Sequence, residues 1–334
     1  MTSGVLTRLL DANARFDLAN RGTVNHLPMA LYALSRLGAS DRRLEEYFGW
    51  WEENRALPRR ASPRSVTAES WRAEIGQADM FDSLWVAFRQ RAEAAGPDAP
   101  IREVYPKVAD GVGAAAFHGL IRLAYGTETG HCGEIGAGLA TLCSRYAPLG
   151  VSLDAAPEAA SVEAAFVRIS EALGGRRFTG QGIIGRMQSA AADLQFVASL
   201  SRPALSPDRL LAELAQIAIR LYWQTADFTV LHLVTTSHAA RILFTRYPQL
   251  LTRQAADALW LAACAAYASV GAPLSQQPIV PDDVADWPEI CGGAVARNDD
   301  HVIKMVYTCR CEEAHYGDPI YRAAAARLTA AGKS

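Results

Sequence analysis

Ala- and Leu-rich segments with helical spacing dominate this chain, and few stretches alternate apolar and polar residues as strands do. Residues 252–270 are the clearest case, because Ala, Leu and Trp follow one another there with no helix breaker. Half of the 334 residues are hydrophobic, which is enough to build a sizeable core. The pattern predicts an all-α, single-domain multi-helix bundle that spans residues 1–334.

Further helices are predicted from amphipathic spacing and from the residues that end each segment. They cover residues 4–17, 27–37, 71–95, 134–146, 154–173, 206–223, 228–244 and 320–328. Residues 57–67, 174–185 and 272–289 are predicted connections, and Pro100 is expected to interrupt the chain. The Gly-rich connection lacks G-x-G-x-x-G spacing and a preceding strand, so no phosphate-binding role is assigned to it.

Charge and targeting signals narrow the class of protein. The net charge is −2, so no basic surplus indicates a nucleic-acid partner. No apolar run is long enough to span a bilayer, and the first residues lack the basic-then-apolar order of a signal peptide. The six Cys residues do not have the spacing of a disulfide framework. We therefore expect a cytoplasmic protein with reduced thiols and no membrane or nucleic-acid partner.

Four of the seven histidines occur in or at the start of apolar helical segments. They are His26, His118, His232 and His301, two in each half of the chain, which hints at an internal duplication. A single histidine of this kind is more often a packed core imidazole. Four in similar settings indicate a shared metal, because facing helices of a bundle build metal sites in this way. Neutral imidazole suits Fe, Zn, Cu and Ni.

The segment 298–307 adds an unusual lysine. Asp299 and Asp300 fall where a helix N-terminus favours negative charge, and His301 and Lys304 share one helix face. Taken alone, Lys304 is expected to extend its amine to the surface. A desolvated, neutral amine could instead take up CO₂ and become a carbamate, which is an anionic oxygen ligand. Asp300 and Asp227 are the alternative carboxylate ligands.

Four segments resemble the characteristic blocks of the questin oxidase-like family. They are Asn25–Leu31, Phe117–Ile121, Leu231–Thr235 and His301–Lys304. Members of this family oxidise anthraquinones and related polyketides, and at least one resembles a non-haem iron oxygenase with four histidine ligands and a carboxylated lysine. Where many fungal members have a second histidine, four residues after the one that matches His118, this chain has Arg122.

Carried over to this sequence, the resemblance implies mononuclear Fe(II) held by His26, His118, His232, His301 and carboxylated Lys304. It implies an O₂-dependent oxygenase that oxidises or cleaves a ring of an anthraquinone-like aromatic polyketide in natural-product biosynthesis. One alternative is a Baeyer–Villiger-type oxidase without bound metal that uses NADPH as an external reductant. Another is a non-catalytic helical protein that binds a polyketide. The oligomeric state stays open.

Other motifs compete with this interpretation. Glu128-x-x-His131 and Glu312-x-x-His315 match part of a di-iron pattern, but nearby glycines and a proline disrupt both as mid-helix sites. Cys309, Cys311 and His315 lack the second ligand pair of a zinc finger. His131 is expected on the surface and His238 in core packing. Several aromatic residues are candidates for a flat pocket near the metal: Trp50, Trp51, Tyr125, Tyr222, Trp223 and Tyr307.

Overall fold

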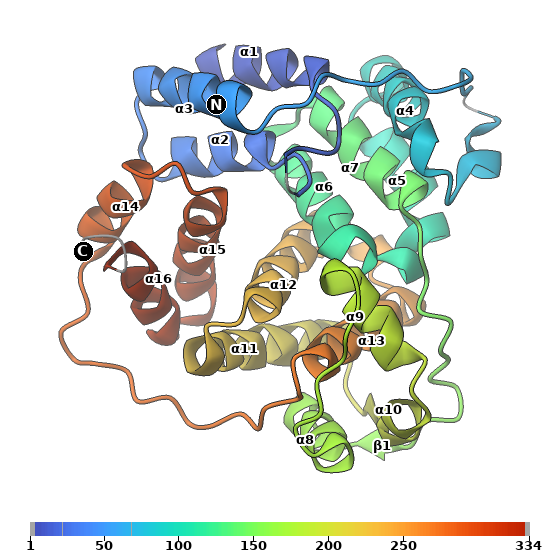
Figure 1. The fold of residues 1–334 in the computed structure, drawn as a ribbon, viewed down its shortest axis with the longest axis vertical. Coiled ribbons are helices and arrows are strands. Elements are labelled where there is room, and N and C mark those ends of the chain that lie inside the picture. Colours follow the sequence, from blue (N-terminus) through green and yellow to red (C-terminus); the bar gives the residue numbers. More distant parts are fainter. Residues whose placement is uncertain (1–3, 22, 68, 331–334) are drawn as a thin grey trace.

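The computed structural model describes residues 4–21, 23–67 and 69–330, and this part of the chain is mostly helical (Figure 1). The predicted range 1–334 extends at both ends beyond these residues. The α-helices are α1 (Gly4–Ala12), α2 (Leu27–Arg36), α3 (Asp41–Asn54), α4 (Phe81–Ala95), α5 (Asp98–Val108), α6 (His118–Thr129), α7 (Cys132–Ser144), α8 (Val162–Leu173), α9 (Gly182–Ala191), α10 (Leu194–Ser199), α11 (Pro207–Thr225), α12 (Phe228–Arg246), α13 (Arg253–Ser269), α14 (Trp287–Val295), α15 (Asp300–Tyr316) and α16 (Ile320–Ala330).

Strand structure in the described residues is limited to two dipeptides. β1 (Glu158–Ala159) pairs in parallel with β2 (Arg202–Pro203), and this pair only ties the start of α8 to the segment before α11. The all-α prediction is therefore confirmed.

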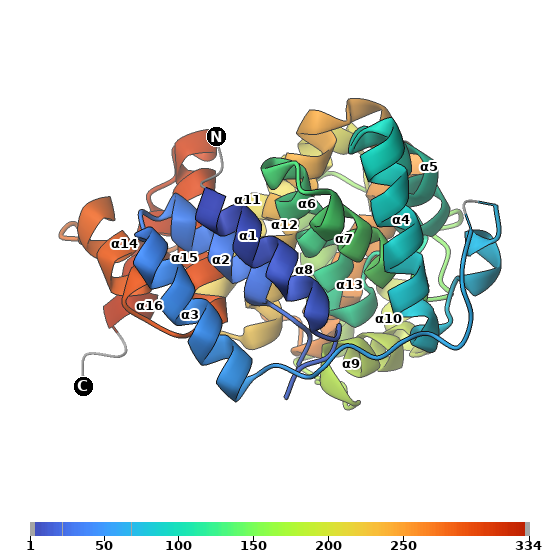
Figure 2. The ribbon, with the colours of Figure 1, turned by 90° about the horizontal axis from the view of Figure 1, so that it is seen from above.

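Four helices form a closed circuit at the middle of the molecule. α2 packs against α6, α6 against α12, α12 against α15, and α15 back against α2. In Figures 1 and 2, α1 and α3 lie along α2, while α7 lies beside α6 and packs in turn against α4 and α5. This circuit brings together segments from both ends and from the centre of the sequence.

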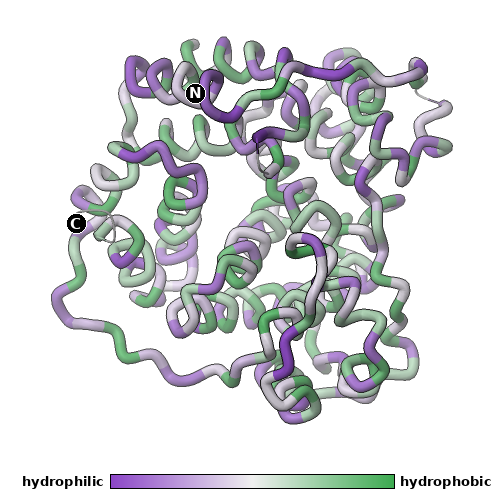
Figure 3. Tube along the Cα trace, viewed as in Figure 1, coloured by the Kyte–Doolittle hydropathy of each residue, from purple (hydrophilic) through white to green (hydrophobic). Residues whose placement is uncertain are grey.

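One hydrophobic core joins these elements. Its buried residues run from Leu6 in α1 to Tyr321 in α16, and Trp51, Trp71 and Trp260 are among its largest buried side chains. Figure 3 shows hydrophobic residues along the helices of both halves, as expected of a single core. Each fully buried Leu or Phe contributes roughly 1.5–3 kcal/mol relative to exposure. None of the described helices combines the length and apolar character needed to cross a membrane.

Several predicted boundaries are wrong for local reasons. Pro100 does not break the chain but lies in the first turn of α5, where backbone N–H groups make no intrahelical hydrogen bond and none is lost. Residues 71–80 form short 3₁₀ turns before α4, because Gly76 adopts a positive φ. The helix predicted from residue 154 begins only at Val162, where Ser161 caps it. The first helix ends at Ala12.

Candidate metal centre

The four predicted histidines lie at or near helix starts. His26 is the residue before α2, and His118 is the first residue of α6. His301 follows the N-cap Asp299 in the first turn of α15, and His232 lies in the second turn of α12. Because α2, α6, α12 and α15 pack in a circuit, these positions meet.

The imidazole rings form their own closed circuit. The ring centroids of His26 and His118 are 4.6 Å apart, and those of His118 and His232 are 5.1 Å apart. The circuit continues from His232 to His301 at 5.5 Å and returns to His26 at 4.7 Å. Side chains separated by up to 275 positions in the sequence are thus in direct contact.

Two of the rings are oriented by backbone carbonyls. Nδ1 of His118 contacts the carbonyl of Ala115 at 2.5 Å, and Nδ1 of His232 contacts that of Phe228 at 2.8 Å. A carbonyl only accepts, so each Nδ1 must carry the proton. In the neutral ring, Nε2 is then left with a lone pair.

Asp300 orients the other two rings. Its Oδ1 lies 2.6 Å from Nδ1 of His301 and 3.1 Å from Nδ1 of His26. These contacts lower the pKa of Asp300 well below its usual range, although burial alone would raise it. Histidine ligands of metals usually donate their second nitrogen to a carboxylate or a carbonyl. Nδ1 of each ring here has such an oxygen within 3.1 Å, although the contact of His26 with Asp300 does not have hydrogen-bond geometry.

The remaining Nε2 atoms lack suitable protein partners. Nε2 of His26 and Nε2 of His118 are 2.6 Å apart, where two lone pairs repel each other unless a cation or a proton lies between them. Nε2 of His301 is buried without a hydrogen-bond partner. Ligand atoms of His26, Asp300 and His301 also lie within 4.8 Å of one another. This donor set fits a metal that binds imidazole nitrogen.

Burial keeps the imidazoles of His26, His118 and His232 neutral. It lowers the pKa of His26 to about 3, with the nearby Lys304 adding to the effect and Asp300 opposing it. The pKa values of His118 and His232 are also lowered well below the usual value, first by burial. Neutral imidazole is the form that ligates a metal, so at neutral pH no proton has to be removed from these rings before a metal binds.

Lys304 is buried beside this cluster, and the expectation that its amine reaches the surface is wrong. Its side chain lies one turn beyond His301 in α15, and the residue is 3% exposed. Burial lowers its pKa to about 8, while Asp300 and Asp299 oppose that shift. Part of the population therefore carries a neutral, nucleophilic amine near neutral pH.

A cavity of about 310 Å³ opens onto the four histidines. Most of its other lining side chains are apolar, and they come from the segment before α2, the turn before α6, α9 and the start of α12: Val24, Ala115, Ala116, Ile183, Ile184 and Phe228. Phe228 is 49% exposed and contacts the rings of His232 and His301. The volume and apolar lining are typical of a small-molecule site.

A left-handed turn precedes His118. Ala115, Ala116 and Phe117 have φ values of 50°, 53° and 65°. Such a conformation costs roughly 1–2 kcal/mol per residue without glycine. It places the carbonyl of Ala115 against His118 and puts Ala115 and Ala116 in the cavity wall. Strain of this kind concentrates at functional sites, and no glycine or proline signals it in the sequence.

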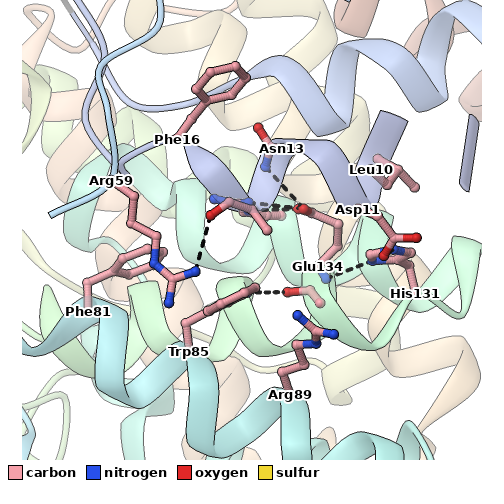
Figure 4. A pocket seen from close by; sticks show the side chains of 13 residues that line it. Leu10, Asp11, Asn13, Phe16, Arg59, Phe81, Trp85, Arg89, His131 and Glu134 are labelled. Atoms are coloured by element: carbon pink, nitrogen blue, oxygen red, sulfur yellow. Dashed lines mark hydrogen bonds and ion pairs between the residues drawn. The ribbon is translucent and has the colours of Figure 1, made fainter. Parts of the chain in front are cut away.

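A buried polar network connects Glu134 in α7 with Asn25, the residue before His26, and Figure 4 shows its contact between Asn13 and Glu134. Arg122 forms a bidentate pair with Glu134 at 2.7 and 3.1 Å, and Glu134 accepts a hydrogen bond from Asn13 at 3.2 Å. Asn13 in turn accepts from Asn25, the residue before His26, at 2.9 Å. Arg122, at which this chain departs from the fungal pattern, thus pairs with Glu134.

The structure assigns other contacts to the competing motifs. Asp227 caps α12, and His131, expected on the surface, caps α7 with its ring. His238 is buried in the core, as predicted, where it contacts Glu312 at 2.6 Å. Tyr307 donates to Glu128 at 2.9 Å. The glutamate of each Glu-x-x-His motif is therefore already engaged, Glu128 by Tyr307 and Glu312 by His238.

The remaining candidate residues are dispersed. His315 is exposed, Cys309 is buried and Cys311 is half-buried. None of the tryptophans and tyrosines named as candidates for a flat pocket is among the described residues that line the histidine cavity. Packing places Tyr125 and Tyr307 in a separate cluster deeper in the bundle, and Trp223 lies at another cavity.

Comparison with known proteins gives one result that covers most of the chain. A sequence model described as questin oxidase-like matches residues 23–309, a range that includes all four histidines and Lys304. No curated protein matches the chain.

Proposed function

The chain belongs to the questin oxidase-like family, and on that premise we propose that it is a mononuclear non-haem iron oxygenase. Its substrate would be an anthraquinone-like aromatic polyketide, of which it oxidises or cleaves a ring. Family membership supports the coarser part of this proposal, an oxidoreductase with an anthraquinone-related role. The Fe(II) dependence, the use of O₂ and the ring cleavage are the further steps.

The observation that carries the proposal is the arrangement of the imidazole nitrogens. Each of the four rings has Nδ1 close to a carbonyl or to Asp300, which leaves Nε2 as the nitrogen for a metal. His26, His118, His232 and His301 would hold the ion. When bound, Fe(II) supplies the one-electron chemistry that O₂ activation requires and that these side chains lack.

Lys304 would supply the anionic ligand. Its neutral amine can attack CO₂: the nitrogen–carbon bond forms, one proton is released, and the product is a carbamate anion. The buried position of the amine and its pKa of about 8 favour this reaction, because the uncharged form is the nucleophile. A carbamate would also neutralise part of the charge that a divalent ion brings into a site of neutral imidazoles.

The protein contributes position and a dry environment. The apolar cavity at the histidines would hold the flat substrate and exclude water from the reacting atoms. Asp300 lies within 3.1 Å of Nδ1 of both His26 and His301, so it would favour a proton on these nitrogens and leave Nε2 of both rings for the metal.

Metal analysis of the purified protein tests the proposal. We expect about one iron per chain, loss of that iron in His118→Ala and in His301→Ala, and retention in the control His315→Ala, whose ring is exposed. Incubation with ¹³C-bicarbonate should give a carbamate signal in the ¹³C NMR spectrum of the diamagnetic Zn(II)-substituted protein, absent in Lys304→Met.

The same preparations separate the alternatives. Consumption of O₂ with a hydroxyanthraquinone, in the absence of NADPH and dependent on iron, supports the oxygenase. Metal-free protein that turns over only with NADPH would indicate the Baeyer–Villiger-type oxidase. Tight substrate binding without turnover, by protein that holds no metal, would indicate a polyketide-binding protein.

A further inference from the structure

Arg186 is the one described residue in the wall of the histidine cavity with a permanent charge. It lies in α9, shortly after Ile183 and Ile184, which line the same cavity. The imidazoles of His26, His118 and His232 are neutral at the pKa values that burial gives them. A guanidinium in such a wall needs a partner that compensates for lost hydration.

The protein provides only part of that compensation. One guanidinium nitrogen, Nη2, donates to the hydroxyl of Thr229 at 2.8 Å. The Nε–H group is buried and has no hydrogen-bond partner. Within the described chain, no carboxylate lies at ion-pair distance from this arginine, and Asp300, the acidic group nearest the histidines, is engaged with two of them. The residue as a whole is half-buried, so an oxygen in the cavity can still reach part of its guanidinium.

We propose that Arg186 binds an anionic oxygen of the substrate, namely the phenolate of a hydroxylated anthraquinone. This inference rests on the proposed function and adds the feature by which the cavity selects its substrate. The planar guanidinium has Nη1 without a hydrogen bond in the described chain, and this nitrogen would donate to the substrate oxygen while Thr229 fixes the orientation of the group through Nη2. The aliphatic wall would cover the ring face. A metal at the histidines would add positive charge and favour the ionised substrate further.

The test uses equilibrium binding to the full-length, metal-loaded protein under anaerobic conditions. The probes are 1,8-dihydroxyanthraquinone, its dimethyl ether, and anthraquinone-2-carboxylate, each followed by visible absorption. We expect Arg186→Met to weaken binding of the dihydroxy probe about 10- to 100-fold, since a hydrogen bond to a charged group is lost. The long-wavelength phenolate band of the bound probe should weaken as well. Binding of the dimethyl ether should change little.

Matched variants guard against a general effect on folding. Arg209→Met removes an exposed arginine of α11 and should leave binding unchanged. Arg186→Lys keeps the charge without the planar fork, so its affinity should lie between wild type and Arg186→Met. Iron content should be the same in all three variants.

Each outcome decides one part of the proposal. Equal affinity of wild type and Arg186→Met for the dihydroxy probe overturns the role of Arg186, while a normal iron content leaves the oxygenase proposal standing. An arginine-dependent affinity for the carboxylate alone overturns the assignment to a phenolate. If wild-type protein with iron binds none of the probes, the inference and the anthraquinone substrate fail together. If it holds no iron, the metal proposal fails separately.

Discussion

Two layers on the same four helices differ in how their polar groups are satisfied. The histidine layer contains His26, His118, His232 and His301. The tyrosine layer follows six or seven residues later on α2, α6, α12 and α15, and it contains Tyr32, Tyr125, His238 and Tyr307. At 1.5 Å per residue, the two layers are about 9–10 Å apart along the helices.

The tyrosine layer is closed by the protein's own carboxylates. Tyr307 donates to Glu128, and Glu312 pairs with both His238 and Arg241. Its rings meet edge to face in the contacts that Tyr307 makes with Tyr32, at 5.7 Å, and with His238, at 5.6 Å. In the histidine layer, His26 and His118 approach to 4.6 Å with lone pairs facing each other. The tyrosine layer contains carboxylates that pair with its own residues, although the hydroxyl of Tyr125 and Nε2 of His238 have no hydrogen-bond partner in the described chain. The histidine layer instead brings two imidazole nitrogens within 2.6 Å of each other, which is the contact that the proposed metal would relieve.

The largest expected difference between the layers is in metal content. His232 and His238 lie on the same helix, so His232→Ala and His238→Ala form a matched pair. We expect His232→Ala to lose most bound iron, because a ligand is missing. His238→Ala should keep its iron but lose about 1–3 kcal/mol of unfolding free energy, since Glu312 loses one of two partners. Metal analysis and urea unfolding measure both effects. Iron loss from both variants would contradict the division into layers.

Glu312→Gln tests the charge in the tyrosine layer. The side chain is 1% exposed, and its loss of charge leaves Arg241 and His238 without their carboxylate. Breaking a buried pair typically costs about 3–5 kcal/mol. We expect this loss in the free energy of unfolding at neutral pH, with iron content unchanged. The exposed Glu46→Gln in α3, from an i,i+4 surface pair, is the control and should change stability by less than about 0.5 kcal/mol.

Acid should act on the same carboxylate. Burial alone would raise the pKa of Glu312, but the hydrogen bonds and charges of His238 and Arg241 outweigh it and lower the pKa from 4.5 to about 2. The folded state therefore binds this proton less readily than the unfolded state. The contribution of about 3 kcal/mol is complete above pH 4.5 and disappears as the pH falls to about 2. Urea unfolding at several pH values should show that the gap between wild type and Glu312→Gln narrows over this range. A constant gap would refute the assignment.

Asp300→Asn should have the smallest effect of this series. The amide retains the size of Asp300 but loses the charge that orients His26 and His301. Removing such an outer partner of metal ligands typically weakens metal binding 10- to 100-fold. We expect weaker iron affinity in a competition titration with a chelator. Complete loss of iron would instead make Asp300 a direct ligand.

The candidate site was largely predictable from the sequence because its residues lie near helix starts. Residue 28, a proline, and the acidic pair at 299 and 300 are local signals that place His26 and His301 at the beginnings of α2 and α15. Such signals could not predict that Asp300 orients two histidines while Asp227 only caps a helix. Nor could they predict the left-handed turn at Ala115, which contains no glycine.

The sequence by itself determined the all-α class, the positions of most helices and the residue types that could bind a metal. Helical periodicity and capping depend on neighbours within a few positions, so they can be read directly from the chain. Only the tertiary structure decided that Lys304 is buried, that Arg122 pairs with Glu134, and that Arg186 faces the histidine cavity. Burial and pairing depend on helices far apart in sequence, whose contacts arise only when the whole core packs.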